Sequence, residues 1–272
     1  HHLVGAQGFR KATDLYFDRF DGCAVTTEDF VQCMEQANDI DLRLFRNWYT
    51  QAGTPVVTVT QKYDASAKSL QLHISQTCPP TPGQKTKKPF HIPVSFALIS
   101  PDGIISDEQT LTVDKLEQTF EFDADTRPVV SFLRDFSAPI KLVFDQTEQE
   151  LAHLVKHDNN GFVRFEAIQR MVLNLLLPAI QDGELDKDSL GVLVETLQYV
   201  LNNPPKYQAM LAELLSLPSE SYLADSIGNN VDPLQVSVKR NLLMQTLSQA
   251  LESSLLTHYH SCAPEKEFSL DS

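Results

Sequence analysis

The stretch FRNWYTQAGTPVVTVT, residues 45–60, is where the hydrophobic pattern of the chain changes its period. Before Gly53, the large apolar residues recur at helical intervals, and Gly53 itself is a residue type at which helices commonly stop. The large apolar residues at helical intervals are Leu42, Phe45, Trp48 and Tyr49. After Thr54-Pro55, Val57 and Val59 alternate with threonines, which is the two-residue period of a strand. The sequence therefore predicts a boundary between helical and β structure at residues 53–54.

Residues 54–145 continue this alternation in short runs that are separated by turn residues. Pro101-Asp102-Gly103 is one such turn, because Pro presets φ and Gly accepts a positive φ. About seven runs of this kind predict an antiparallel β-sandwich. We expect the apolar members of the alternating pairs to face its interior. These residues are Val57, Val59, Leu72, Ile74, Val94, Phe96, Phe120 and Leu142.

Residues 1–53 have the pattern of short helices. A first helix carries Phe9 and Phe20 and stops at Gly22, and Thr26 is suited to cap a second helix whose first turn is acidic. The apolar face of these helices is larger than about 50 residues can bury among themselves. Together with the lack of an initiator Met, this predicts the end of a helical domain that is cut from a longer chain.

From residue 146 to residue 272 the pattern is again helical. Thr147 and Glu150 form a capping-box sequence, Pro204-Pro205 ends one helix, and Asp232-Pro233 opens a long one. The helices between them carry leucine-rich faces and are joined by short loops. This arrangement predicts antiparallel helices stacked as an irregular solenoid, although no strict sequence repeat is present.

The overall composition excludes several classes of function. The formal net charge is −14, and the densest basic cluster, Lys85, Lys87 and Lys88, lies in a Pro-rich loop that we interpret as a solvated loop tip. Binding to nucleic acid or to an anionic membrane surface requires more basic residues than that. The four cysteines are far apart in sequence, no apolar run approaches 18 residues, and no signal-peptide pattern is present. These features predict a cytoplasmic protein with reduced thiols.

Several short strings follow one another along the chain in a recognisable order. They are GFRK (8–11), LYF (15–17), FDG (20–22), TEDF (27–30), FRNWY (45–49), QAGTP (51–55), HIP (91–93) and FSAP (136–139). Together they resemble the bacterial aminopeptidase N family of zinc-dependent gluzincins in order and approximate spacing. The resemblance covers nearly the whole chain and is strongest before residue 60 and between residues 90 and 145.

This resemblance implies that the parent protein is a zinc aminopeptidase that hydrolyses N-terminal amino acids from peptides. In such an enzyme a zinc-bound water attacks the first peptide bond and a glutamate acts as base. The family's His-Glu-x-x-His zinc motif, its Gly-x-Met-Glu-Asn motif and its transition-state tyrosine lie upstream of the region that this chain resembles. None of these motifs occurs in residues 1–272. We therefore expect no catalytic, cofactor-binding or metal-binding residue in this chain.

The same resemblance implies three domains. Residues 1–53 would be the end of the helical part of a thermolysin-like catalytic domain, and residues 54–145 a spacer sandwich. Residues 146–272 would be the first part of a helical C-terminal domain that closes over the active site. On this hypothesis the chain is structural and inactive alone, and zinc and peptides belong to the parent protein.

Two pairs of histidines have spacings that suggest metal binding. His153 and His157 stand four residues apart, as in the zincin motif, but Leu154 occupies the position of the catalytic base and no third ligand is near in sequence. We interpret them as surface or capping histidines. His258 and His260 lie at the end of the last predicted helix, where a positive charge is favourable.

The alternative hypothesis is a stand-alone scaffold or protein-binding module of β-sandwich plus helical repeats. It explains the missing catalytic motifs but not the helices of residues 1–53. If the truncation hypothesis is right, both ends of the chain expose apolar side chains and favour self-association. We expect this surface to include Phe9, Phe17, Phe30 and Trp48 at one end and Leu247, Leu251 and Leu255 at the other.

Overall fold

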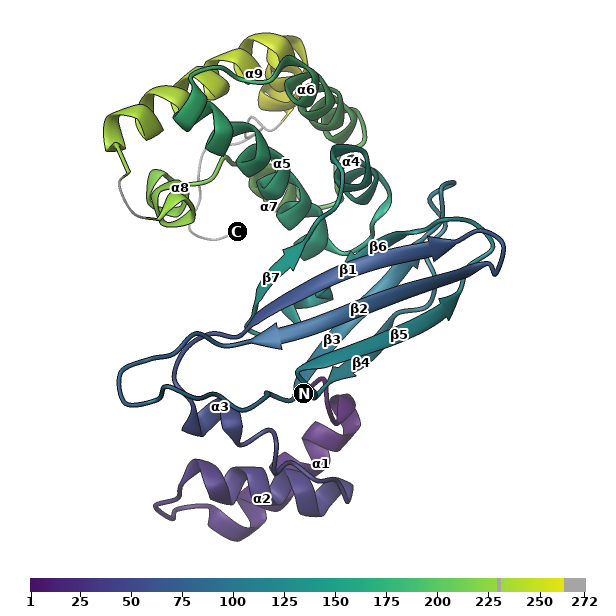
Figure 1. The fold of residues 1–272 in the computed structure, drawn as a ribbon, viewed down its shortest axis with the longest axis vertical. Coiled ribbons are helices and arrows are strands. Elements are labelled where there is room, and N and C mark those ends of the chain that lie inside the picture. Colours follow the sequence, from purple (N-terminus) through teal and green to yellow (C-terminus); the bar gives the residue numbers. More distant parts are fainter. Residues whose placement is uncertain (229–230, 262–272) are drawn as a thin grey trace, which may run out of the picture. The chain divides into compact units, whose positions relative to one another are not determined.

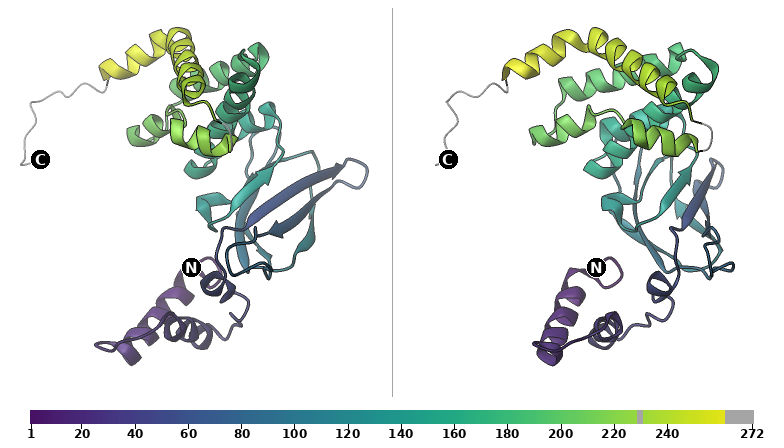
Figure 2. Two further views of the ribbon diagram at one scale, coloured as in Figure 1. Left: turned by 60° about the vertical axis from the view of Figure 1, so that its left-hand side comes forward. Right: turned by 90° about the vertical axis from the view of Figure 1, so that its left-hand side faces the viewer.

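The computed structural model of the chain describes residues 1–228 and 231–261. It divides into two compact units, residues 1–145 and residues 146–272, each of which is described here by itself (Figures 1 and 2). The first unit contains three helices and all seven strands, and the second contains six helices within its described residues. In the described part of the chain, no helix has both the length and the apolar character needed to span a membrane.

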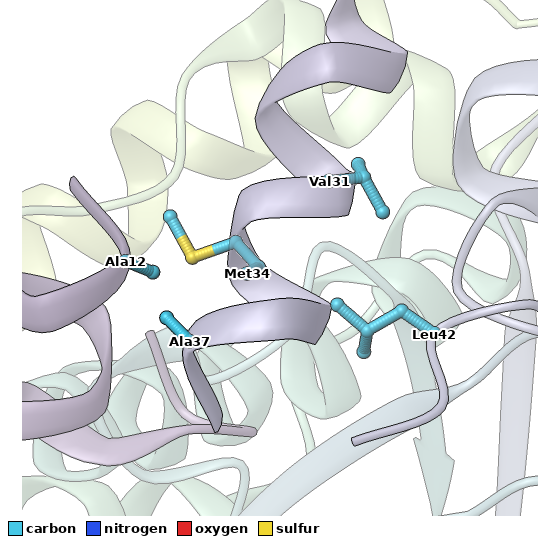
Figure 3. Packing of buried hydrophobic residues seen from close by; sticks show 5 residues of the cluster. All are labelled: Ala12, Val31, Met34, Ala37 and Leu42. Carbon is cyan, nitrogen blue, oxygen red and sulfur yellow. The ribbon is translucent and has the colours of Figure 1, made fainter. Parts of the chain in front are cut away.

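The helices of the first unit are short and pack through small residues. They are α1 (Gly5–Phe20), α2 (Thr27–Asn38) and α3 (Asn47–Thr50). Thr26 begins α2, and its N–H and hydroxyl donate to the Asp29 carboxylate at 2.8 and 2.7 Å. Ala12 on α1 meets the apolar face of α2 in a small core that Leu42 completes (Figure 3). The remaining buried members of this core are Val31, Met34 and Ala37.

The β-sandwich consists of a four-stranded and a three-stranded sheet. Its strands are β1 (Val56–Asp64), β2 (Ser69–Thr77), β3 (Ile92–Ile99), β4 (Gln109–Val113), β5 (Glu117–Asp123), β6 (Val129–Phe132) and β7 (Lys141–Phe144). The strand orders are β5-β2-β1-β7 and β4-β3-β6. All pairings are antiparallel except that of β1 with β7, which is parallel and sets Val57 opposite Leu142.

The interior of the sandwich follows the predicted alternation on the inner strands. Six of the eight residues expected inside are at most 1% exposed: Val57, Val59, Leu72, Ile74, Val94 and Phe96. Phe120 and Leu142 are only half-buried, because β5 and β7 are the edge strands of their sheet. On β3 the alternation fails, since Ser95 and Ala97 are buried as well. The turn η1 (Arg134–Phe136) contacts this strand, and the Ser95 N–H donates to Ser137 Oγ at 2.9 Å.

The second unit is a stack of helices. They are α4 (Glu148–His157), α5 (Gly161–Asp182), α6 (Lys187–Asn202), α7 (Gln208–Leu214), α8 (Glu220–Ile227) and α9 (Pro233–Ser261). The capping box predicted for Thr147 and Glu150 is present at the start of α4. Sequence reasoning missed α8, whose Ser219 cap accepts a hydrogen bond from the Tyr222 N–H at 3.1 Å. Its eight residues carry only three large apolar side chains, Tyr222, Leu223 and Ile227, which is too few to give a periodic signal.

The face that we expected α9 to leave uncovered is instead buried within its own unit. Leu247 and Leu251 are 7% and 3% exposed, and Leu255 is half-buried. Helices α5, α6 and α8 all contact α9 and cover this face. The expectation that Leu247 and Leu251 await missing helices was therefore wrong. At the other end of the chain, Phe17 is 57% exposed, whereas Phe9, Phe30 and Trp48 are half-buried.

We expect Phe96→Ala to lower the free energy of unfolding by about 3–5 kcal/mol, because it empties a site at the centre of the sandwich. Phe96 is fully buried, and its ring centroid lies 4.9 Å from that of Phe122. Leu116→Ala is the matched control, since Leu116 is 58% exposed and should change stability by no more than about 0.5 kcal/mol. Denaturant unfolding measures both. A loss below about 1 kcal/mol for Phe96→Ala would contradict the assigned core.

Candidate functional site

The most elaborate polar arrangement in the first unit connects α3 to the loop before β3. Trp48 Nε1 donates to the carbonyl of His91 at 2.9 Å, and Asn47 Nδ2 donates to that of Pro89 at 2.7 Å. The ring centroids of Trp48 and Phe90 are 4.7 Å apart. Because Phe90 is only 1% exposed, these contacts attach α3 directly to the core of the sandwich. We call residues 47–52 and 81–91 together the joint.

Side-chain amides extend the joint past the end of α3. Gln51 exchanges two hydrogen bonds with the backbone of Lys88, one in each direction, at 3.0 and 2.6 Å. The Gln84 side chain also makes two hydrogen bonds to backbone. Its Nε2 donates to the Thr50 carbonyl at 2.9 Å, and its Oε1 accepts from the Ala52 N–H at 2.8 Å. The backbone that leads from the helix toward the strand is therefore hydrogen-bonded at Thr50 and Ala52.

Lys87 also belongs to the joint, although sequence reasoning placed it at a solvated loop tip. Its ammonium group donates to the Ala52 carbonyl at 2.8 Å, to Thr81 Oγ1 at 2.7 Å and to Gln84 Oε1 at 2.8 Å. Lys85 and Lys88 are exposed, as expected, but Lys87 is half-buried. A basic side chain that satisfies carbonyl and hydroxyl oxygens of its own loop has a structural role.

Arg46, just before α3, holds the helices of the first unit together. Its guanidinium donates two hydrogen bonds to Glu28, at 2.8 and 2.6 Å, and two to Glu35, at 2.8 and 2.9 Å. Glu35 Oε1 also accepts the Leu42 N–H at 2.8 Å. The bonds from Arg46 lower the pKa of Glu35, against a smaller opposing effect of burial. Bidentate pairing of this kind fixes the relative orientation of the side chains in addition to pairing their charges.

An apolar cavity of about 310 Å³ lies between these helices and the sandwich. Its walls come from α1, α2, the residues around α3 and two segments of the sandwich. They include Phe9, Phe30, Met34, Leu42, Phe45, Trp48, Pro93, Ala138 and Pro139. The polar side chains of His1, His2 and Ser137 also line it. A surface of this mainly apolar composition can receive apolar side chains.

One wall of this cavity is formed by residues that come directly after a strained turn in the chain. Three residues other than glycine have positive φ there, Leu133 at 61°, Asp135 at 51° and Phe136 at 51°. Each costs on the order of 1–3 kcal/mol and persists only where the surrounding structure imposes it. Arg134, 4% exposed, donates to Glu108 Oε2 at 2.7 Å and to Ser131 Oγ at 2.9 Å and so holds the turn in place. The turn leads into Ser137, Ala138 and Pro139, which line the cavity.

The histidine pairs do not assemble a metal centre in the described residues. The rings of His153 and His157 are 4.4 Å apart between centroids, and burial, followed by the charge of His153, lowers the pKa of His157. His258 Nε2 lies 2.6 Å from the carbonyl of Leu201, near the end of α6. Across residues 1–228 and 231–261, no group of three His, Cys, Asp or Glu side chains is placed to hold a metal ion.

Sequence reasoning missed a half-buried carboxylate in the second unit. Glu166 on α5 has its pKa raised by burial, and Arg170, one turn along the helix, only partly offsets that effect. The pKa of Tyr222 on α8 is raised by its own burial and by the charge of Glu166. The sequence carries only a weak signal for this, because Glu166 is one of four polar residues in the stretch FVRFEAIQRMV, residues 162–172.

Comparisons with known proteins cover nearly all of the chain. Residues 53–145 match a family described as a domain of unknown function (DUF3458) with an Ig-like fold, and residues 148–272 match one described as DUF3458_C with ARM repeats. These matches and the structure confirm the predicted fold class, a mixed multidomain chain of β-sandwich followed by helical solenoid.

Three relatives are proteins named aminopeptidase N. The chain is 38% identical to that of Escherichia coli (strain K12), 36% to that of Haemophilus influenzae and 36% to that of Caulobacter vibrioides. The alignments cover 96%, 95% and 99% of this chain and 31% of each relative. The crystal structure of Legionella pneumophila aminopeptidase A in complex with aspartic acid is also similar, with a TM-score of 0.83 and 26% identity over 98% of this chain and 31% of that one. The chain thus spans just under a third of the length of these proteins.

We expect Glu166→Gln to stabilise the protein at pH 7 by an amount on the order of 1 kcal/mol. The folded state disfavours the charged form, so its penalty is present at neutral pH and disappears as the pH falls through the raised pKa of Glu166. The gain should therefore shrink between pH 7 and the unfolded-state pKa near 4.5. Glu213→Gln, at an exposed position of α7, is the control and should change little. Destabilisation by Glu166→Gln at pH 7 would show that the carboxylate has a favourable partner.

Proposed function

Because the chain belongs to the aminopeptidase N family, we propose that it is a non-catalytic part of a zinc-dependent aminopeptidase that removes N-terminal amino acids from peptides. The 36–38% identity to three aminopeptidases N over nearly all of the chain carries this proposal. It confirms the family that the sequence strings indicated. The activity, the peptide substrates and the zinc belong to the proposal, because the chain covers 31% of each of those relatives.

The residues of this chain do not fit a catalytic zinc. A zinc hydrolase needs three protein ligands, an open position and a base. His153 and His157 would supply two ligands, but Leu154 follows the first, and the described residues place no third ligand beside them. In the proposal, metal, base and the groups that bind the peptide's α-amine all come from polypeptide outside residues 1–272.

What the chain would contribute is architecture. We propose that residues 1–53 complete the catalytic domain, that residues 54–145 are a spacer sandwich, and that residues 146–272 begin the helical domain that caps the active site. The joint supports this role, since its hydrogen bonds fix residues 47–52 on the loop that leads into β3. Any displacement of the sandwich would be transmitted to the helices through Trp48 and Arg46.

We further propose that the protein is cytoplasmic and binds neither nucleic acid nor membrane. The described cysteines, Cys23, Cys33 and Cys78, are all free thiols, which suits a reducing compartment. The net charge of −14 disfavours contact with nucleic acid or anionic lipid.

We expect the isolated chain to show no hydrolysis of aminoacyl anilides above the buffer rate, with or without added zinc. Positioned metal and base account for most of such an enzyme's acceleration, which is about a millionfold or more. The comparison protein is the variant His153→Ala with His157→Ala, which removes the one histidine pair of α4. Zinc-dependent turnover that survives both this variant and repeated purification would contradict the proposal.

A further inference from the structure

The sequence contains a single Asn-Gly pair, Asn160-Gly161, and it lies where α5 begins. An asparagine side chain can react with the backbone nitrogen that follows it, and glycine leaves this nitrogen unhindered because it has no Cβ. In this reaction Gly161 N attacks Asn160 Cγ, ammonia leaves, and a cyclic succinimide forms. Water then opens the ring at either carbonyl, which gives aspartate or isoaspartate. The net reaction consumes a water molecule and releases ammonia.

The folded backbone of Asn160 keeps the two reacting atoms apart. In the succinimide ring, Gly161 N and Asn160 Cβ are nearly eclipsed about the Cα–C bond. For an L residue, the tetrahedral geometry at Cα places that arrangement at a ψ of about −120°. The ψ of Asn160 is 115°. The reaction therefore requires a large rotation between Asn160 and the first residue of α5.

Hydrogen bonds on both sides of the rotating bond hold Asn160 in this conformation. We call residues 158–164, in which they lie, the corner. The Asn160 N–H donates to Asp158 Oδ1 at 2.8 Å, and Asn160 Oδ1 accepts from the Val163 N–H at 3.1 Å as the N-cap of α5. The Asn160 carbonyl accepts from the Arg164 N–H at 3.1 Å. Because the rotation turns the Asn160 side chain relative to α5, it breaks the N-cap bond.

Packing encloses the same bond. Asn160 is 6% exposed, so little water reaches its side chain in the folded state. A Cβ built on Gly161 would lie 3.2 Å from Met210 Sδ and 3.4 Å from Met210 Cε, so the side chain of Met210 on α7 lies directly against this glycine. Removing that side chain should therefore lower the free energy of opening the corner.

We propose that Asn160-Gly161 is a deamidation site that the folded corner keeps closed and that reacts only when the corner opens. Local opening takes microseconds to seconds, which is much shorter than deamidation needs. The rate in the folded chain is then the rate in the unfolded chain multiplied by the fraction of corners that are open. Isoaspartate places Cβ in the main chain and moves the capping oxygen, so the corner cannot close as before. A transient opening is thereby recorded as a permanent change.

Peptide mapping by mass spectrometry tests the proposal on the full chain. Wild type is incubated at mildly alkaline pH, folded in buffer and unfolded in urea, and isoaspartate is detected with an isoaspartate-specific methyltransferase. We expect Asn160 to react in urea and to react at least about tenfold more slowly in the folded chain. Asn159, which is exposed and followed by an asparagine, is the internal control and should react more slowly than Asn160 in urea. Equal rates at Asn160 in buffer and in urea would overturn the proposal, as would a rate in urea no higher than that of Asn159.

The variant Met210→Ala tests whether opening of the corner sets the rate. It should speed deamidation of the folded chain at least about threefold and leave the rate in urea unchanged, because it acts only on the opening step. Met244→Ala is the matched control, since Met244 is 43% exposed on α9 and its removal should change neither rate. Asn160→Ser keeps a capping oxygen but has no amide, so the isoaspartate signal at residue 160 should disappear. A folded-state rate that stays at the wild-type value in Met210→Ala would overturn the proposal.

Discussion

The first unit depends on the attachment of Trp48 to the loop before β3. The indole donates to the His91 carbonyl and packs on Phe90, which is itself part of the sandwich core. Three short helices with a small core of Ala12, Val31 and their neighbours could not be stable alone. The sandwich stabilises the helices through this one aromatic contact and the hydrogen bonds around it. The helices and the sandwich are therefore one compact unit despite the change of period at residues 53–54.

The other unusual features of this unit serve the same attachment. Arg46 pairs with two glutamates of α2 and so fixes the helices to the residue that precedes α3. The strained turn at residues 133–136 brings Ser137–Pro139 to the cavity that Trp48 also lines. The joint is consistent with the proposed role of residues 54–145 as a spacer sandwich.

Much of the fold could be predicted from the sequence, because periodicity reports directly on which side of an element is buried. The inner strands obeyed the alternation, and the capping box at Thr147 formed as expected. Prediction failed where tertiary contacts determine whether a side chain is buried. Phe120 and Leu142 lie on edge strands, and Ser95 is covered by a crossing turn. Lys87 is bound by oxygen atoms of the joint. On α9 both faces are apolar, so the sequence could not show which of them the unit buries. In the sequence, the joint could be recognised only from strings that resemble the family, since the residues that Asn47 and Trp48 contact lie about 40 residues away.

Trp48 is the single tryptophan of the chain, so its fluorescence reports on the joint alone. The decisive measurement follows its emission during urea unfolding beside the hydrogen-exchange protection of Ile74 and Phe96, which lie in the sandwich core. If the helices depend on the sandwich, the emission of Trp48 and the protection of the core will be lost at the same urea concentration. A red shift of Trp48 emission that is complete while Ile74 and Phe96 remain protected would contradict the account, because the helices would then detach at residue 53 as an independent element.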